Sequence, residues 1–198
     1  PFDVCVPTGN FGNILAAWYA RLLGAPIRRL AVACNANRVV CDFVRTGRYD
    51  ARRPFRVTNA PSMDILVSSN VERLLWLLTR GNDVEVRTWQ SQLQAEGAFQ
   101  ITGHPLHDLR ADWAAAWATP DETERAIADV WERFGYLVDP HTAIAWKALR
   151  DLPPTGRPTL IAATASPWKF PRTVLRALTG QEPPEDDFEA MEALAAHT

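Results

Sequence analysis

The first part of the chain shows the alternation of hydrophobic and polar residues expected of strands followed by helices. A short apolar run at 3–7 ends in a turn rich in Gly and Asn at 8–13, and apolar residues then recur at helical spacing from 14 to 23. A second apolar run at 29–34 precedes a helical pattern over about 38–45. The order strand, turn, helix, strand, helix predicts a parallel α/β sheet.

The rest of the chain divides into a mostly helical middle and a second α/β stretch. After residue 60 the pattern predicts, in order, helices at 70–79 and 84–96, a strand at 99–102, helices at 106–117 and from 119, a helix at 141–149, a strand at 158–163, and helices at 171–178 and 185–196. Thr119 and Glu122 have the spacing of a capping box. We therefore expect 1–80 to be part of an α/β domain, 81–134 a mainly helical insertion or lobe, and 135–198 the return to the α/β domain with a C-terminal helix.

Composition narrows the partners and the environment of the chain. The 21 Lys and Arg residues nearly balance 23 Asp and Glu residues, so the net charge is −2, and no apolar run approaches the roughly 20 residues of a membrane helix. We expect neither nucleic acid nor a membrane as the main partner. Cys5, Cys34 and Cys41 are odd in number and lack Cys-x-x-Cys spacing, which disfavours a disulfide framework or zinc and favours a reduced, cytoplasmic setting.

The turn Thr8-Gly9-Asn10-Phe11-Gly12-Asn13 is the main candidate for chemistry. It follows a strand and opens a helix, where free backbone N–H groups and the helix dipole favour an anion such as phosphate. Gly9 and Gly12 would let the backbone approach phosphate oxygens, while Asn10 and Asn13 would add amides or cap the helix. The alternative is an ordinary strand-to-helix turn. Neither a P-loop nor the dinucleotide fingerprint matches this turn.

Five stretches in this order resemble the threonine synthases, a family of fold-type-II enzymes that use pyridoxal 5'-phosphate (PLP). The stretches are Val6–Asn13; Asn35–Asp42 with Phe43, Thr46 and Gly47; Ser62–Ile65 with Ser68–Asn70 and Glu72–Leu74; Asp139–Ala143; and Ala163–Pro167 with Lys169–Pro171. The resemblance covers 1–80 and 135–178 well. It implies a mostly parallel, three-layer α/β fold with the helical stretch as an insertion.

The resemblance also implies a cofactor site and a reaction. Gly9, Asn10, Phe11, Gly12 and Asn13 would hold the PLP phosphate through backbone amides, and the Thr164 hydroxyl would meet the pyridine nitrogen. The two sites would then lie about 5 to 10 Å apart, on the same side of the sheet. The other possibility for Thr164 is a strand-end threonine bonded to its own backbone. The family converts O-phospho-L-homoserine and water to L-threonine and phosphate.

The lysine that forms the Schiff base in this family lies upstream of the glycine turn, in a Phe-Lys-Asp-like segment that this sequence does not contain. Lys147 and Lys169 are the only lysines; the first is expected on a helix surface, and the second belongs to another motif. We therefore assign no catalytic residue and expect this chain to be an inactive C-terminal portion, whose partner is the missing N-terminal portion of the same polypeptide. The chain also begins almost inside a strand, as expected of a fragment.

Other functions and other site residues remain open. The alternatives are a related fold-type-II enzyme such as a serine or threonine dehydratase, a threonine-synthase-like paralogue, and a non-enzymatic domain that binds a phosphate ligand. The sequence favours a structural role for His141 over a catalytic one. His104 and His107 lack a third metal ligand nearby, which disfavours a metal site. The arginine pairs near 28, 45–48 and 52 could meet a phosphorylated substrate, although solvated surface is commoner. Ser68-Ser69-Asn70 is expected to cap a helix.

Overall fold

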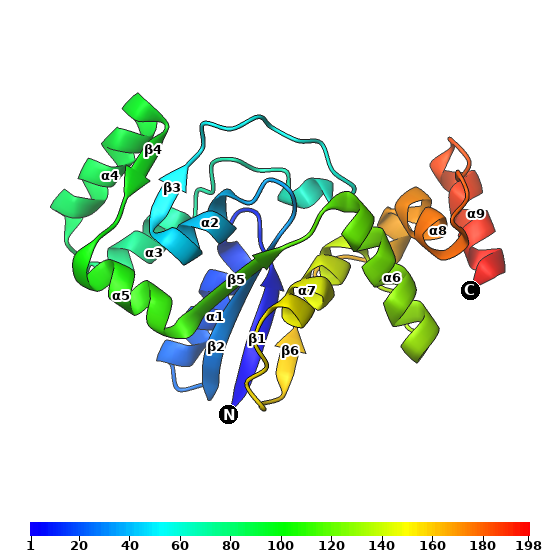
Figure 1. The fold of residues 1–198 in the computed structure, drawn as a ribbon, viewed down its shortest axis with the longest axis horizontal. Helices are drawn as coiled ribbons and strands as arrows, with labels where there is room; N and C mark the ends of the chain where they lie inside the picture. Colours follow the sequence, from blue (N-terminus) through cyan, green and yellow to red (C-terminus); the bar gives the residue numbers. More distant parts are fainter.

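The computed structural model describes residues 1–198 and contains one parallel sheet with helices on both faces (Figure 1). The sheet has the strand order β5-β2-β1-β6, and every pairing in it is parallel. Its strands are β1 (Phe2–Pro7), β2 (Ile27–Cys34), β5 (Trp113–Trp117) and β6 (Thr159–Ile161). A separate antiparallel pair joins β3 (Arg48–Asp50) to β4 (Ala98–Gln100). The expected three-layer α/β fold is confirmed.

The helices follow the order predicted from the sequence. They are α1 (Gly12–Leu22), α2 (Val39–Thr46), α3 (Val71–Leu78), α4 (Asp83–Glu96), α5 (Gly103–Asp112), α6 (Pro120–Phe134), α7 (Pro140–Asp151), α8 (Pro171–Thr179) and α9 (Asp187–His197), with 3₁₀ turns η1 (Pro61–Met63) and η2 (Pro167–Lys169). The capping box at the start of α6 is present: the Thr119 hydroxyl accepts from the Glu122 amide at 3.2 Å, and Glu122 Oε2 accepts from the Thr119 amide at 2.8 Å.

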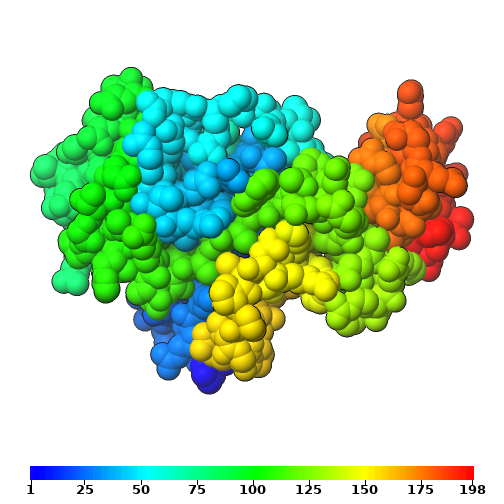
Figure 2. All heavy atoms as spheres, in the orientation of Figure 1, coloured from blue at the N-terminus to red at the C-terminus, as the bar shows by residue number.

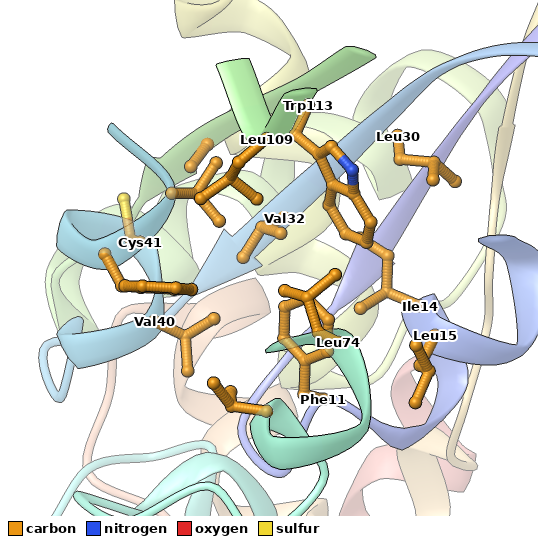
Figure 3. Close-up of a cluster of buried hydrophobic side chains, with 14 of the residues drawn as sticks. Phe11, Ile14, Leu15, Leu30, Val32, Val40, Cys41, Leu74, Leu109 and Trp113 are labelled. Carbon is orange, nitrogen blue, oxygen red and sulfur yellow. The ribbon is translucent and has the colours of Figure 1, made fainter. Parts of the chain in front are cut away.

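The two faces of the sheet carry side chains of different size. Val4, Val6, Leu30, Val32 and Trp113 lie in the larger core, which is covered by α1, α2, α3 and α5 (Figure 3). On the opposite face the two central strands carry small residues, which pack against α7: Cys5, Ala31, Ala33 and Ala116 meet Ile144, Ala145 and Ala148 of that helix. Since successive residues of a strand point to opposite faces, this division follows directly from the alternation along β1 and β2.

One prediction in the middle of the chain is wrong. The helix expected over 106–117 ends at Asp112, and Trp113–Trp117 forms strand β5, which pairs with β2 from Leu30 to Cys34. Alanine favours helices, but the buried pairing with β2 outweighs that local preference here. The middle of the chain therefore contributes an outer strand to the main sheet. The proposed boundaries at 80 and 134 stay a prediction.

The C-terminal helices form a lobe beside the sheet, seen at the right in Figures 1 and 2. Helices α6, α7, α8 and α9 share a third apolar cluster that includes Ile127, Ala143, Val174 and Leu194. No helix of the chain combines the length and apolar character needed to span a membrane.

Buried Asp3 joins the start of β1 to two neighbouring segments. Its carboxylate accepts hydrogen bonds from Thr155 Oγ1 at 2.5 Å and Arg157 Nε at 2.9 Å, and Arg29 Nε lies 3.3 Å away. Burial raises the pKa of Asp3, but the hydrogen bonds from Thr155 and Arg157 and the charge of Arg29 outweigh it, so the pKa lies below its usual value. Other arginines of the basic segments also pair with carboxylates, namely Arg48 and Arg52 with Asp50 and Arg53 with Asp42.

Candidate functional site

A cavity of about 380 Å³ lies beyond the carboxyl end of β1. It is lined by the turn at 8–13, by Ser62, Met63 and Asn70, and by His141, Thr164 and Ala165. Crevices at the carboxyl ends of parallel strands are the usual ligand sites of open α/β sheets, and this volume suits a small ligand. The structure therefore brings both sequence-predicted groups, the glycine turn and Thr164, to one cavity.

The backbone of the turn offers unpaired hydrogen-bond donors. No acceptor within the chain receives a hydrogen bond from the amide N–H groups of Gly9, Asn10 or Phe11. Gly12 and Asn13 begin α1, where the first amides of a helix have no acceptor within the helix. Of the residues in the turn, Asn10, Gly12 and Asn13 are exposed. A cluster of free amides at the positive end of a helix dipole is suited to bind a phosphate group.

Phe11 holds the turn in its conformation. Its backbone is left-handed, with a φ of 66°, which is strained for a residue with a bulky side chain. The side chain is 1% exposed and its ring stacks on Trp113 at a centroid distance of 5.3 Å. Figure 3 shows Phe11 within the core cluster, beneath the sheet. Phe11 therefore contributes its amide to the cavity while its side chain anchors the turn from below.

The two glycines of the turn differ in how closely other protein atoms approach them. A Cβ on Gly9 would lie 2.8 Å from Met63 Cα, so glycine is required because two backbones meet there. A Cβ on Gly12 would meet Asn70 Nδ2 at 3.5 Å, an ordinary contact. Glycine at position 9 therefore lets the turn pack closely against Met63, whereas no protein atom lies in tight contact with position 12. That the glycines also let the backbone approach a ligand stays a prediction.

The asparagine of the turn ties it to the start of α3. Asn10 Oδ1 accepts from the amide and the hydroxyl of Ser69, at 2.9 and 3.0 Å, and the Asn10 carbonyl accepts from Asn70 Nδ2 at 2.9 Å. Ser69 and Asn70 thus bind the turn, whereas Asn70 makes no side-chain cap on α3. The expectation that this segment caps a helix is wrong, and the Asn10 side chain is occupied inside the protein. No side-chain hydrogen bond involves Asn13.

A buried polar network positions the segment that carries Ser62 and Met63. Asp64 Oδ1 accepts from Asn35 Nδ2 at 2.7 Å, Asn37 Nδ2 at 2.9 Å and Thr58 Oγ1 at 2.8 Å, while its Oδ2 accepts from the Thr58 amide at 2.9 Å. Asn35 and Asn37 directly follow β2 and are almost fully buried. The network therefore fixes 58–64 against the sheet, beside the turn.

Thr164 lies after β6 and is exposed at the cavity. Its hydroxyl makes no hydrogen bond within the chain, so the alternative of a threonine bonded to its own backbone does not apply. It lies on the same side of the sheet as the turn, since both line one cavity. A free hydroxyl there is able to meet a ring nitrogen of a ligand.

His141 was not expected to take part in the site, yet it lines the cavity. It is 2% exposed, and its Nδ1 lies 2.8 Å from Asp139 Oδ1. Asp139 also caps α7, accepting from the amides of His141 and Thr142. Burial raises the pKa of Asp139, but hydrogen bonds from His141 and Thr142 outweigh it and hold the pKa below its usual value. The sequence feature that could have pointed to His141 as a site residue is the Asp139-Pro140-His141-Thr142 stretch.

Comparison with known proteins links the chain to one family. The profile described as "Threonine synthase, C-terminal" matches residues 142–197. Threonine synthase of Saccharomyces cerevisiae is 35% identical over 192 residues, covering 88% of this chain and 37% of that protein. The crystal structure of PLP-bound threonine synthase from Brucella melitensis matches with a TM-score of 0.86 at 38% identity, over 96% of this chain and 41% of that one. The chain belongs to the threonine synthase family.

A second group of relatives carries a related name. Threonine synthase-like 1 of Homo sapiens is 40% identical over 183 residues, which cover 92% of this chain and 25% of that protein. The chain thus spans between a quarter and about two fifths of the length of these relatives. The match lies in the C-terminal portion of the family.

Neither lysine of the chain lines the cavity. Lys147 Nζ pairs with Asp151 at 2.5 Å and Glu122 at 3.2 Å on the outer side of α7. Burial lowers the pKa of Lys147, but the hydrogen bonds to Asp151 and Glu122 outweigh it and leave the pKa raised. Lys169 lies in η2 and borders a different hollow, beside Arg172. The cavity is therefore lined by the free backbone amides of the turn and the hydroxyl of Thr164, and by no lysine amine.

Proposed function

We propose that this chain is the C-terminal portion of a threonine synthase that converts O-phospho-L-homoserine and water to L-threonine and phosphate with PLP. One observation carries the proposal: the free amides of the turn and the free hydroxyl of Thr164 line the same small cavity. Donors for a phosphate at one side and a partner for a ring nitrogen at the other match the two ends of PLP. The residues present therefore fit this cofactor.

Each group has a defined part in the proposal. The amides of Gly9, Asn10, Phe11, Gly12 and Asn13 bind the cofactor phosphate. The Thr164 hydroxyl donates to the pyridine nitrogen and leaves it largely unprotonated, since a neutral hydroxyl does not stabilise a pyridinium as a carboxylate would. When bound, PLP withdraws electrons from the substrate, and the protein supplies binding and orientation.

The proposal includes an upstream portion of the same polypeptide. That portion would supply the lysine that carries PLP, because Lys147 and Lys169 lie outside the cavity. We propose a cytoplasmic location for the whole protein, because Cys5, Cys34 and Cys41 are all free thiols. The substrate O-phospho-L-homoserine belongs to this proposal as well.

A second candidate is a threonine-synthase-like paralogue that acts on another substrate. It is favoured by one observation: identity to Threonine synthase-like 1 of several mammals reaches 40–41%, above the 35–37% found with threonine synthases of fungi and Pseudomonas aeruginosa. Such a protein would keep the phosphate turn and Thr164. Substrate choice therefore separates the two candidates, whereas PLP binding does not.

The test uses the complete polypeptide, purified with PLP. An absorbance band from bound PLP together with release of phosphate from O-phospho-L-homoserine supports threonine synthase. PLP binding with turnover of serine, threonine or another amino acid, and none of O-phospho-L-homoserine, would favour a dehydratase or a paralogue. Absence of PLP binding would leave a non-enzymatic phosphate-binding domain.

The variant Thr164→Asp tests the assignment of the ring partner. A carboxylate would favour a protonated ring, so we expect kcat to fall by at least about tenfold, with the free energy of unfolding unchanged because Thr164 is exposed. Thr164→Ser keeps the hydroxyl and serves as the control. Equal kcat values in the two variants would contradict the assignment.

A further inference from the structure

His141 is the one titratable side chain among the residues that line the cavity. Its residue is 2% exposed, and its Nε2 is buried with no hydrogen-bond partner in the chain. A buried polar atom without a partner costs free energy, and most such atoms in proteins are paired. Because the ring borders a cavity with free hydrogen-bonding groups, the expected partner is a bound ligand.

The contacts of the ring determine what Nε2 can do. Asp139 is ionised in the folded chain and accepts from Nδ1 at 2.8 Å, so Nδ1 carries a hydrogen. Neutral His141 therefore has a bare lone pair at Nε2, and Nε2 becomes a donor only when the ring is protonated.

The aromatic side chain that packs on the ring is uncharged. Phe170 packs against it with the ring centroids 4.9 Å apart, and Thr142 donates its hydroxyl to Asp139 on the same helix. Lys169 and Arg172 flank Phe170, but neither forms an ion pair or a hydrogen bond with His141. Asp139 is thus the charged group in direct contact with this imidazole.

We propose that His141 is a binding residue for an anionic oxygen of a phosphorylated ligand in this cavity, with Asp139 as its positioning residue. The inference rests on the proposed function and adds a residue to it. Nε2–H donates to the oxygen, and the ring takes up a proton from solvent when the ligand binds. PLP and O-phospho-L-homoserine both offer such oxygens.

Two substitutions separate the two nitrogens of the ring. His141→Asn keeps an amide near Nδ1, which is able to donate to Asp139, and removes the group at Nε2. His141→Gln places an amide N–H near Nε2 but does not titrate. His107→Asn removes an exposed imidazole on α5 and is the matched control.

The experiment measures two quantities in the complete polypeptide: the Kd for PLP from its absorbance, and the KM for O-phospho-L-homoserine at saturating PLP. We expect His141→Asn to raise the Kd or the KM by about 10- to 100-fold, as for loss of a hydrogen bond to a charged group. His141→Gln should raise the same constant by a smaller factor. A change in the Kd assigns the contact to the cofactor, and a change in the KM alone assigns it to the substrate.

The pH dependence gives a readout that a merely structural role would not change. Affinity is measured between about pH 6 and 8 in the wild-type protein and in His141→Gln, because an imidazole is able to exchange a proton with solvent and a glutamine amide is not. The ligand phosphate also titrates near 6. The contribution of His141 is therefore the pH dependence of the affinity in the wild-type protein minus the pH dependence in His141→Gln.

Imidazole ¹⁵N spectra of the wild-type protein give a check that needs no substitution. The chain has four histidines, and the Nε2 resonance of one should change from a bare to a protonated nitrogen when the ligand is added. An unchanged spectrum, or Kd and KM values of His141→Asn within twofold of wild type at all pH values, would overturn the inference. If wild-type protein turns over the substrate while His141→Asn is unaltered, only this inference fails. If wild-type protein binds no PLP, the proposed function fails with it.

Discussion

Single residues with two duties determine the shape of the candidate site. Phe11 faces the cavity with its amide and the core with its ring, and the stack on Trp113 compensates for its left-handed backbone. Asn10 shows the same division, since its side-chain oxygen accepts from Ser69 while its backbone N–H makes no hydrogen bond within the chain. The turn was predictable as an anion site from its position between strand and helix. These internal contacts were not, because they join segments about 60 to 100 residues apart.

Asp3 offers a test of stability at this scale. Asp3→Asn leaves the charges of Arg29 and Arg157 without their buried partner, so we expect the free energy of unfolding at pH 7 to fall by about 3 kcal/mol. The folded pKa of Asp3 is lowered, so its stabilisation is complete above the unfolded value near 4 and is lost as pH falls through the folded pKa. The difference between variant and wild type should therefore narrow below about pH 4. Urea unfolding at several pH values measures it, and Glu192→Gln, at an exposed position on α9, is the control.

At the scale of elements, helices with clear caps were predicted well and one strand was not. The Pro and capping signals at 119–122 and the Asp-Pro at 139–140 mark the true starts of α6 and α7. Trp113–Trp117 gave no strand signal, because its three central alanines favour a helix and only the pairing with β2 makes it a strand. Ala116 also contributes to the packing: together with Ala31 and Ala33 of β2 it lets α7 approach the sheet.

The capping box at the start of α6 can be tested directly. Thr119→Ala removes the hydroxyl that accepts from the Glu122 amide, and we expect a loss of about 1 kcal/mol in the free energy of unfolding. Thr119→Ser keeps the oxygen and should lie within about 0.5 kcal/mol of wild type. Thermal unfolding of the three proteins provides the comparison. If alanine and serine proved equally stable, the cap would have no energetic role.

At the scale of the whole molecule, the candidate site lies at one end of a sheet whose outer strands are unpaired on one side. The sheet has open outer edges at β5 and β6, and Leu160 of β6 is 54% exposed. An exposed edge with apolar side chains favours association with another chain or segment. The family motifs in the sequence already pointed to the glycine turn and Thr164, which line one cavity. They did not indicate His141 as a cavity residue, because that depends on where the cap of α7 lies relative to β1.

The isolated chain should lack threonine synthase activity. With no lysine at the cavity, PLP would bind at most without a covalent link, so reduction with borohydride should label neither Lys147 nor Lys169 stoichiometrically. Peptide mapping after reduction measures the labelling, and phosphate release from O-phospho-L-homoserine measures the activity. Stoichiometric labelling of either lysine together with turnover would show that the amine lies within this chain.

The three buried cysteines make the chain its own reporter of local opening. Burial raises the pKa of Cys5 to about 12 and that of Cys41 to about 11, and it also raises that of Cys34. Since the thiolate is the nucleophile, iodoacetamide should alkylate the folded chain only as it opens. Cys5 lies against α7, whereas Cys34 and Cys41 lie in the core on the other face. Equal labelling rates, resolved by mass spectrometry of peptides, would mean that both layers open in one cooperative event; faster labelling of Cys5 would mean that α7 detaches first.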